Sequence, residues 1–172
     1  MIDKSKFRLP KFDPERLSVF WQEIGFCIMQ IQTFELTLSY YLTQVHKIDF
    51  EMNSNKISSL YNKYGKFTIG QLFKEVKECE KLPNDLEKRI DFFIKERNWL
   101  VHNSRKENEG DLFDQSKYNA LIQRIINLAD EALFLAKLFQ EKSEEYILKN
   151  KIMSEEQLDH YTQIVLNSYG KA

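Results

Sequence analysis

The sequence has few of the residues that interrupt a chain, with 5 glycines and 3 prolines among 172 residues. Because glycine and proline form most tight turns and end most helices, their scarcity favours a few long helices. The sequence also lacks any sustained alternation of apolar and polar residues and any Asn-Gly hairpin signal. We therefore expect an all-α fold, a helical bundle with two long helices and several shorter ones.

Cysteine is almost absent as well, and Cys27 and Cys79 lie too far apart in sequence to form a metal-binding or redox motif. Free, buried thiols in a reducing cytosol are the simplest interpretation. No cluster of histidine, cysteine and carboxylate residues has metal-ligand spacing, and no glycine-rich phosphate loop occurs. We expect neither a metal nor a cofactor.

Long apolar runs and an excess of positive charge are missing too. Gln30, Gln32 and Glu35 interrupt the most apolar segment, so no transmembrane helix is expected. The first residues, MIDKSKFRLPKFD, have no apolar segment typical of a secretory signal, which favours a cytoplasmic protein. Because the net charge is −1, any binding of nucleic acid requires a local basic patch.

The sequence has a clear helical periodicity instead. Asp13-Pro14 is a typical helix start, and apolar residues then recur at spacings of three and four as far as about His46. A second long helix is expected after Asp114, running beyond Lys142. Shorter helices are expected at about 56–64 and 68–81, from Asn84 to between His102 and Lys106, and from a capping box at Ser154 as far as Gly170. The expected organisation is an N-terminal arm (1–12) and one helical domain (13–172), with a core of about 15–140 and a C-terminal extension (141–172).

The least ordinary stretch is ERNWLVHNSR, Glu96 to Arg105, late in the helix that starts near Asn84. Arg97 occupies a position where the helix's apolar stripe predicts a hydrophobic residue. Asn98 and His102, four apart, share a helix face, whereas Arg97 and His102 are separated by about 140° on a regular helix.

A second copy of the helix across a two-fold axis would bring these groups together, or the long arginine side chain would close part of the gap. Phe92, Trp99 and Val101 add apolar surface on other sides of the same helix, more than one bundle face needs. We therefore expect a homodimer that forms through this helix.

A purely structural interpretation stays open beside this one. Arg97 would then form an interior ion pair, with Glu35 or Glu96 as the carboxylate, and His102 would simply lie near a helix C-terminus, where histidine is favourable. Because a buried charge without its partner costs about 3–5 kcal/mol, an arginine is an expensive choice for packing alone. From the residues alone, the structural and the functional interpretations are about equally favoured.

The hexapeptide Arg97-Asn98-Trp99-Leu100-Val101-His102 resembles the R-N-x-x-x-H signature of HEPN (higher eukaryotes and prokaryotes nucleotide-binding) domains. The Thr-Ile-Gly-x-Leu helix start at Thr68 and the Leu82-Pro83 break are also similar to bacterial HEPN families. The resemblance extends over about residues 15–140. It implies an all-helical, metal-independent endoribonuclease, a toxin or phage-defence effector, whose site is shared between two protomers. It also implies RNA as substrate and a cognate antitoxin or nucleotidyltransferase as a partner.

The resemblance assigns catalytic roles to Arg97, His102 and Asn98, and a weaker supporting role to Glu35 on the first helix. Histidine is suited to general acid–base catalysis, and arginine to stabilising a doubly negative phosphorane. Attack by the RNA's own 2′-hydroxyl would leave a 2′,3′-cyclic phosphate. An alternative is a non-catalytic HEPN-like module that binds nucleotide, RNA or a protein partner, and a third is a plain helical interaction protein.

A basic surface that contacts the RNA backbone is a further hypothesis. Its candidate residues are Lys63, Lys66, Arg105 and Lys106. An ordinary solvated face explains the same residues.

Overall fold

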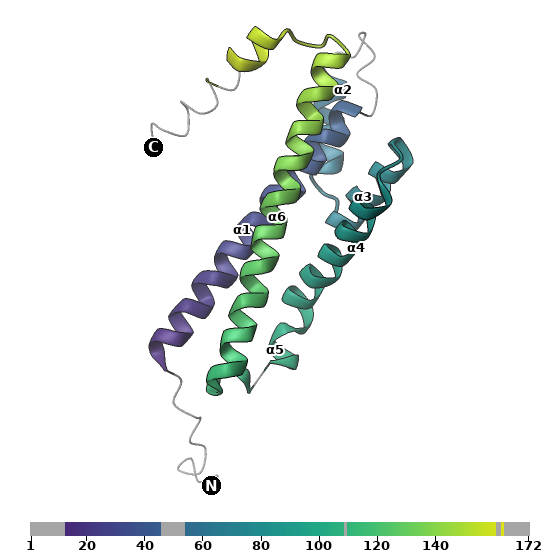
Figure 1. Ribbon diagram of the computed structural model, residues 1–172. Coiled ribbons are helices and arrows are strands. Elements are labelled where there is room, and N and C mark those ends of the chain that lie inside the picture. Colours follow the sequence, from purple (N-terminus) through teal and green to yellow (C-terminus); the bar gives the residue numbers. More distant parts are fainter. Residues whose placement is uncertain (1–12, 46–53, 109, 161–162, 164–172) are drawn as a thin grey trace.

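The computed structural model describes residues 13–45, 54–108, 110–160 and 163, and every regular element in these ranges is helical. Two long helices, α1 (Pro14–Val45) and α6 (Gln115–Lys149), lie side by side and run in the same direction (Figure 1). The Tyr118 hydroxyl donates to the Arg16 carbonyl at 3.2 Å at one end of this pair, and the Tyr41 and Phe139 rings meet further along it. The prediction of an all-α bundle with two long helices is confirmed.

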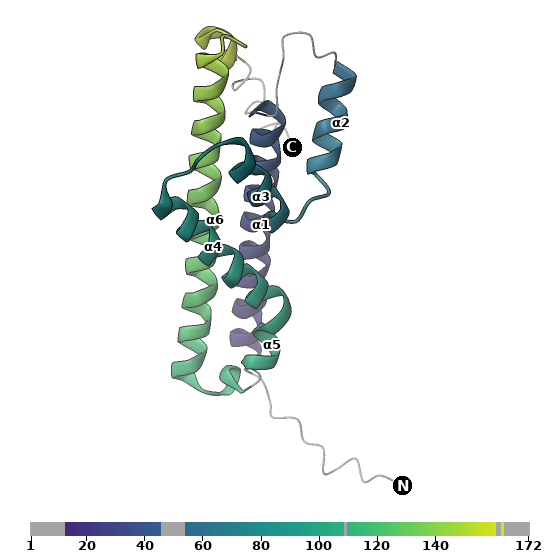
Figure 2. The same ribbon diagram turned by 90° about the vertical axis from the view of Figure 1, so that its right-hand side faces the viewer.

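The shorter elements lie between the long helices in sequence and cover them in space. They are α2 (Ser54–Tyr64), α3 (Ile69–Cys79), α4 (Asn84–Asn98), a π-helical turn (Trp99–Asn103), α5 (Ser104–Glu107) and a 3₁₀ turn (Asp111–Phe113). Figure 2 shows α3 and α4 lying across α1 and α6. In Figure 1, α4 descends from α3 to α5, opposite to the direction of α1.

Both long helices begin at aspartates that cap them, and the sequence predicted the cap at Asp13. The Glu15 N–H donates to Asp13 Oδ1 at 3.0 Å, and the Lys117 N–H donates to Asp114 Oδ1 at 3.0 Å. The second hydrogen bond stabilises the carboxylate form, so it lowers the pKa of Asp114. These bonds satisfy backbone donors that a helix N-terminus otherwise leaves free.

Two capping boxes fix shorter helix starts. The Thr68 N–H donates to Gln71 Oε1 at 2.8 Å at the start of α3. In the second box, the Ser154 N–H donates to Gln157 Oε1 at 2.9 Å, and the Gln157 N–H donates to Ser154 Oγ at 3.2 Å. Helix follows over 155–160, as the sequence predicts.

Some of the expected boundaries differ from the structure or lie beyond it. The helix that contains the polar motif (Arg97, Asn98 and His102) continues to Glu107. It does so through a π-turn that the sequence did not predict. Helix α6 is continuous through residue 141, so the division proposed between 140 and 141 falls inside one helix. The arm 1–12, most of the expected connection at 47–55 and the stop at Gly170 lie outside the described residues.

The core is organised around one aromatic contact between three helices. Phe34 of α1 is 0% exposed, and its ring lies 5.4 Å from that of Phe93 on α4 and 5.9 Å from that of Phe139 on α6. Edge-on and tilted ring pairs of this kind contribute beyond their buried area. The contact therefore fixes α4 in the groove between the two long helices.

The two cysteines are free, as expected, but only one is fully buried. Burial raises the pKa of the Cys27 thiol to about 12, with a smaller contribution from Glu23. Burial also raises the pKa of half-buried Cys79. Neither thiol has the lowered pKa typical of a reactive cysteine.

Replacing Phe34 with alanine should lower the free energy of unfolding by about 3–5 kcal/mol, because it opens a cavity where three helices meet. Urea denaturation followed by circular dichroism measures this change. Phe92→Ala is the matched control, since Phe92 is 63% exposed on α4 and its truncation should change stability by less than about 0.5 kcal/mol. Equal effects of the two substitutions would contradict the packing described here.

Candidate functional site

Arg97 connects α4 to α1 through Glu35. Its Nη2 group donates to Glu35 Oε1 at 3.4 Å, and the two side chains are 21% and 23% exposed. Nη1 donates to Asn98 Oδ1 at 3.4 Å, while the buried Nε has no hydrogen-bond partner among the described residues. The guanidinium is therefore held in place but not sealed from solvent.

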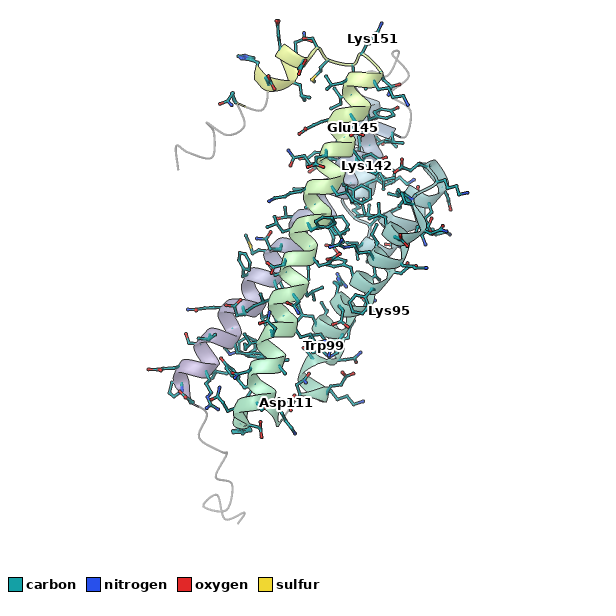
Figure 3. All side chains as sticks on the ribbon, in the orientation of Figure 1. Lys95, Trp99, Asp111, Lys142, Glu145 and Lys151 are labelled. Carbon is teal, nitrogen blue, oxygen red and sulfur yellow. The ribbon has the colours of Figure 1, made fainter. Side chains whose placement is uncertain are left out.

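The neighbouring carboxylate, Glu96, faces the opposite long helix. It accepts two hydrogen bonds from Arg124 of α6, at 2.6 and 2.9 Å. The Arg124 guanidinium carbon also lies 3.4 Å from the centre of the Trp99 ring, which packs between α4 and α6 (Figure 3). The sequence left Glu35 and Glu96 open as partners of Arg97. In the structure Arg97 pairs with Glu35, and Glu96 pairs with Arg124.

The polar motif coincides with the π-turn. The Ser104 N–H donates to the Trp99 carbonyl, five residues back, instead of to Leu100, four residues back as in an α-helix. The Ser104 hydroxyl donates to the Leu100 carbonyl at 2.6 Å. The serine side chain thus provides a donor to the carbonyl that a regular α-helical bond from the Ser104 N–H would have reached.

This turn corrects the geometry expected for the motif. A π-turn contains about one residue more than an α-turn, so residues five apart lie closer to one face than on a regular helix. The angle between Arg97 and His102 consequently falls below the 140° expected from regular pitch. Hydrophobic spacing gave no sign of this, because Trp99 and Leu100 are buried with or without the extra residue in the turn.

His102 and Asn98 are both exposed, whereas Arg97 is half-buried. Asn98 Oδ1 accepts a hydrogen bond from Arg97, so the amide contacts the guanidinium. Within the described part of the chain, no side chain forms a hydrogen bond or ion pair with His102. Its imidazole is thus accessible to a ligand.

The four basic residues proposed to contact RNA do not form one patch. Lys63 ends α2, where it pairs with Glu75 at 3.9 Å and lies over the Tyr64 ring, and Lys66 is exposed in the following turn. Arg105 and Lys106 lie on α5, near the opposite end of the bundle (Figure 1). Only these last two adjoin the motif in sequence.

An open groove of about 410 Å³ lies on the other side of α4, towards α6. Its lining combines exposed Phe92 with the Glu96–Arg124 pair and the amides of Gln123 and Asn127. The Gln123 amide N–H donates to Asn127 Oδ1 at 2.9 Å. The groove contains none of the residues proposed as catalytic.

Across residues 13–45, 54–108 and 110–160, no three histidine, cysteine or acidic side chains are grouped so that they would hold a metal ion. The helices described here include none with the length and apolar character needed to cross a membrane.

Comparisons of this chain with known protein families, with curated proteins and with solved structures found no match.

Ser104→Ala should destabilise the π-turn, because the Leu100 carbonyl loses its hydroxyl donor. We expect a loss of about 1 kcal/mol in unfolding free energy and faster hydrogen exchange confined to the turn. Thr37→Ala is the control: the Thr37 hydroxyl donates to the Thr33 carbonyl at 2.9 Å within regular α-helix, where the backbone bond remains. Unchanged exchange around Ser104 in the first variant would contradict this role of the hydroxyl.

Proposed function

We propose that this chain is a metal-independent endoribonuclease of the HEPN type, acting as a toxin or phage-defence effector. The observation that carries the proposal is the π-turn at the motif, which turns His102 towards the side of the half-buried Arg97. π-turns within helices are rare and occur frequently at functional sites. A turn serving only to pack the helix would not need an arginine, an amide and an imidazole on one accessible side.

The hydrogen-bonding capacity of Arg97 suits phosphate binding. A guanidinium has five N–H donors, and Glu35 and Asn98 each take one from different Nη groups. One N–H on each Nη group remains for a ligand, in the forked arrangement that matches two phosphate oxygens. Glu35 acts as a positioning residue, because it orients the fork without occupying it.

The reaction that fits these groups is cleavage by the RNA's own 2′-hydroxyl. His102 would accept the proton of the attacking hydroxyl or donate one to the leaving 5′-oxygen. Arg97 would stabilise the negative charge that accumulates on the phosphorane. Since a single imidazole does not perform both transfers in one step, a second copy of the motif, supplied by a second protomer, would complete the site.

The test is RNA cleavage by the purified protein in EDTA, with the products analysed for a 2′,3′-cyclic phosphate and a 5′-hydroxyl. His102→Ala should reduce the rate by on the order of 100-fold or more, which is the usual contribution of acid–base catalysis. Arg97→Lys should also impair cleavage, because it retains the charge but loses the fork.

His160→Ala is the matched control, since His160 is an exposed histidine on the C-terminal helical segment and should leave the rate unchanged. The proposal fails if the wild-type protein does not cleave RNA. It fails equally if His102→Ala cleaves as fast as the wild type.

One observation favours a second candidate, a non-catalytic helical interaction module. The Arg97–Glu35 ion pair gives the cation an intramolecular partner, so its charge is partly explained without any ligand. This candidate predicts that Arg97→Ala lowers stability but that neither the wild type nor the variant acts on RNA. The cleavage assay therefore separates the two candidates.

A further inference from the structure

From Leu17 onward, the solvent-facing half of α1 has no charge. Between Leu17 and Val45 the only charged residues are Glu23 and Glu35, and neither is among the exposed ones. We call the exposed set the uncharged face of α1. It consists of Ser18, Val19, Trp21, Gln22, Gly25, Phe26, Ile28, Met29, Gln32, Thr33, Leu36 and Tyr40.

The parallel helix α6 provides a comparison within the same molecule. It is of similar length and also half solvated, yet its exposed residues include Lys117, Asp130, Lys137, Glu141 and Glu145. A helix that meets only water normally has charges of this kind on its outer face. Helix α1 does not, so its outer face differs from a solvated surface.

The uncharged face is also large and apolar. Trp21 is 60% exposed and Met29 63%, and Val19, Phe26, Ile28 and Leu36 add to them. Together these six side chains expose on the order of 500 Å², near the upper end for the largest apolar patch of a monomer. The Thr33 hydroxyl donates to the Met29 carbonyl at 2.9 Å, so the O–H donor of this polar side chain is bonded within the helix.

Gly25 lies near the middle of this face. Glycine inside a helix is destabilising, and nothing lies within 4 Å of the position that a Cβ atom would take. The folded monomer therefore has no packing reason to keep a glycine here. Trp21 and Met29 each lie one turn from Gly25. Without a side chain between them, the helix surface has a shallow depression at Gly25, where the backbone of another helix can approach closely.

We infer that the uncharged face of α1 binds the same face of a second copy of this chain around a two-fold axis. At such an axis identical residues meet, so any charge near it would face its own copy and repel it. A face without charge avoids this repulsion. A stable interface buries about 800 Å² per partner, of which rather more than half is apolar, and the apolar area of this face meets that requirement.

The position of the face also connects it to the motif. Gln32 and Ile28 lie three and seven residues before Glu35, on the same side of α1, so the Arg97–Glu35 pair borders the uncharged face. Because α4 runs opposite to α1, the chain after Arg97 passes towards the N-terminal half of α1 (Figure 1). A second copy on this face would place both motifs along the seam. This last step rests on the proposed function, whereas the pairing itself does not.

Analytical ultracentrifugation of the full chain tests the pairing. The wild type should sediment as a dimer. Gly25→Glu and Met29→Glu should each raise the dimer dissociation constant at least tenfold. Gly25→Glu separates dissociation from unfolding more clearly than Met29→Glu. Because glutamate has a higher helix propensity than glycine, this substitution should raise the thermal midpoint of the monomer. Loss of the dimer would then not be due to unfolding.

Each variant has a matched control away from the face. Gly70→Glu replaces another exposed helix glycine with open space around it, and Phe92→Glu replaces a side chain that is 63% exposed, like Met29. Both should remain dimeric. A monomeric wild type, or dissociation by the control substitutions and not by those on α1, overturns the inference. A dimer that does not cleave RNA would instead refute the proposed function and leave the pairing intact.

Discussion

The contact between Phe34, Phe93 and Phe139 is the constraint on which the rest of the structure depends. Helices α1 and α6 run in the same direction, so the chain between them must travel back along the bundle, and α4 makes most of this return. The three rings determine the depth at which α4 lies between the long helices. Since Arg97 follows Phe93 by one turn, the same contact brings the guanidinium to Glu35.

Two adjacent residues of opposite charge then fix the rotation of α4. Glu96 faces Arg124 on α6, whereas Arg97 faces Glu35 on α1. The two ion pairs leave the helix about 100° apart, one towards α6 and one towards α1, so rotation in either direction would stretch one of them. A half-buried arginine thus contributes to the positioning of α4 and retains donors for a phosphate. The structural and functional interpretations of Arg97 are therefore compatible.

Most of the fold was predictable because its signals are local. Asp13, Thr68 and Asp114 cap helices through bonds that span two or three residues, and the apolar spacing between them is regular. The pairing of Arg97 with Glu35 rather than Glu96 was not predictable, because it depends on how helices rotate against one another. The π-turn was missed because one extra residue in a turn leaves no trace in hydrophobic spacing. The uncharged residues of α1 are visible in the sequence, but only the packing shows that they face outward.

The orientation of His102 relative to Arg97 also depends on the number of residues in the π-turn. If one residue were removed between Asn98 and Ser104, the backbone would return to ordinary pitch and the buried stretch on either side would remain apolar. Such a deletion would leave the flanking helices facing the core and would change the direction of the imidazole relative to the guanidinium. The number of residues in this turn thus sets the orientation of His102 separately from the packing of α4.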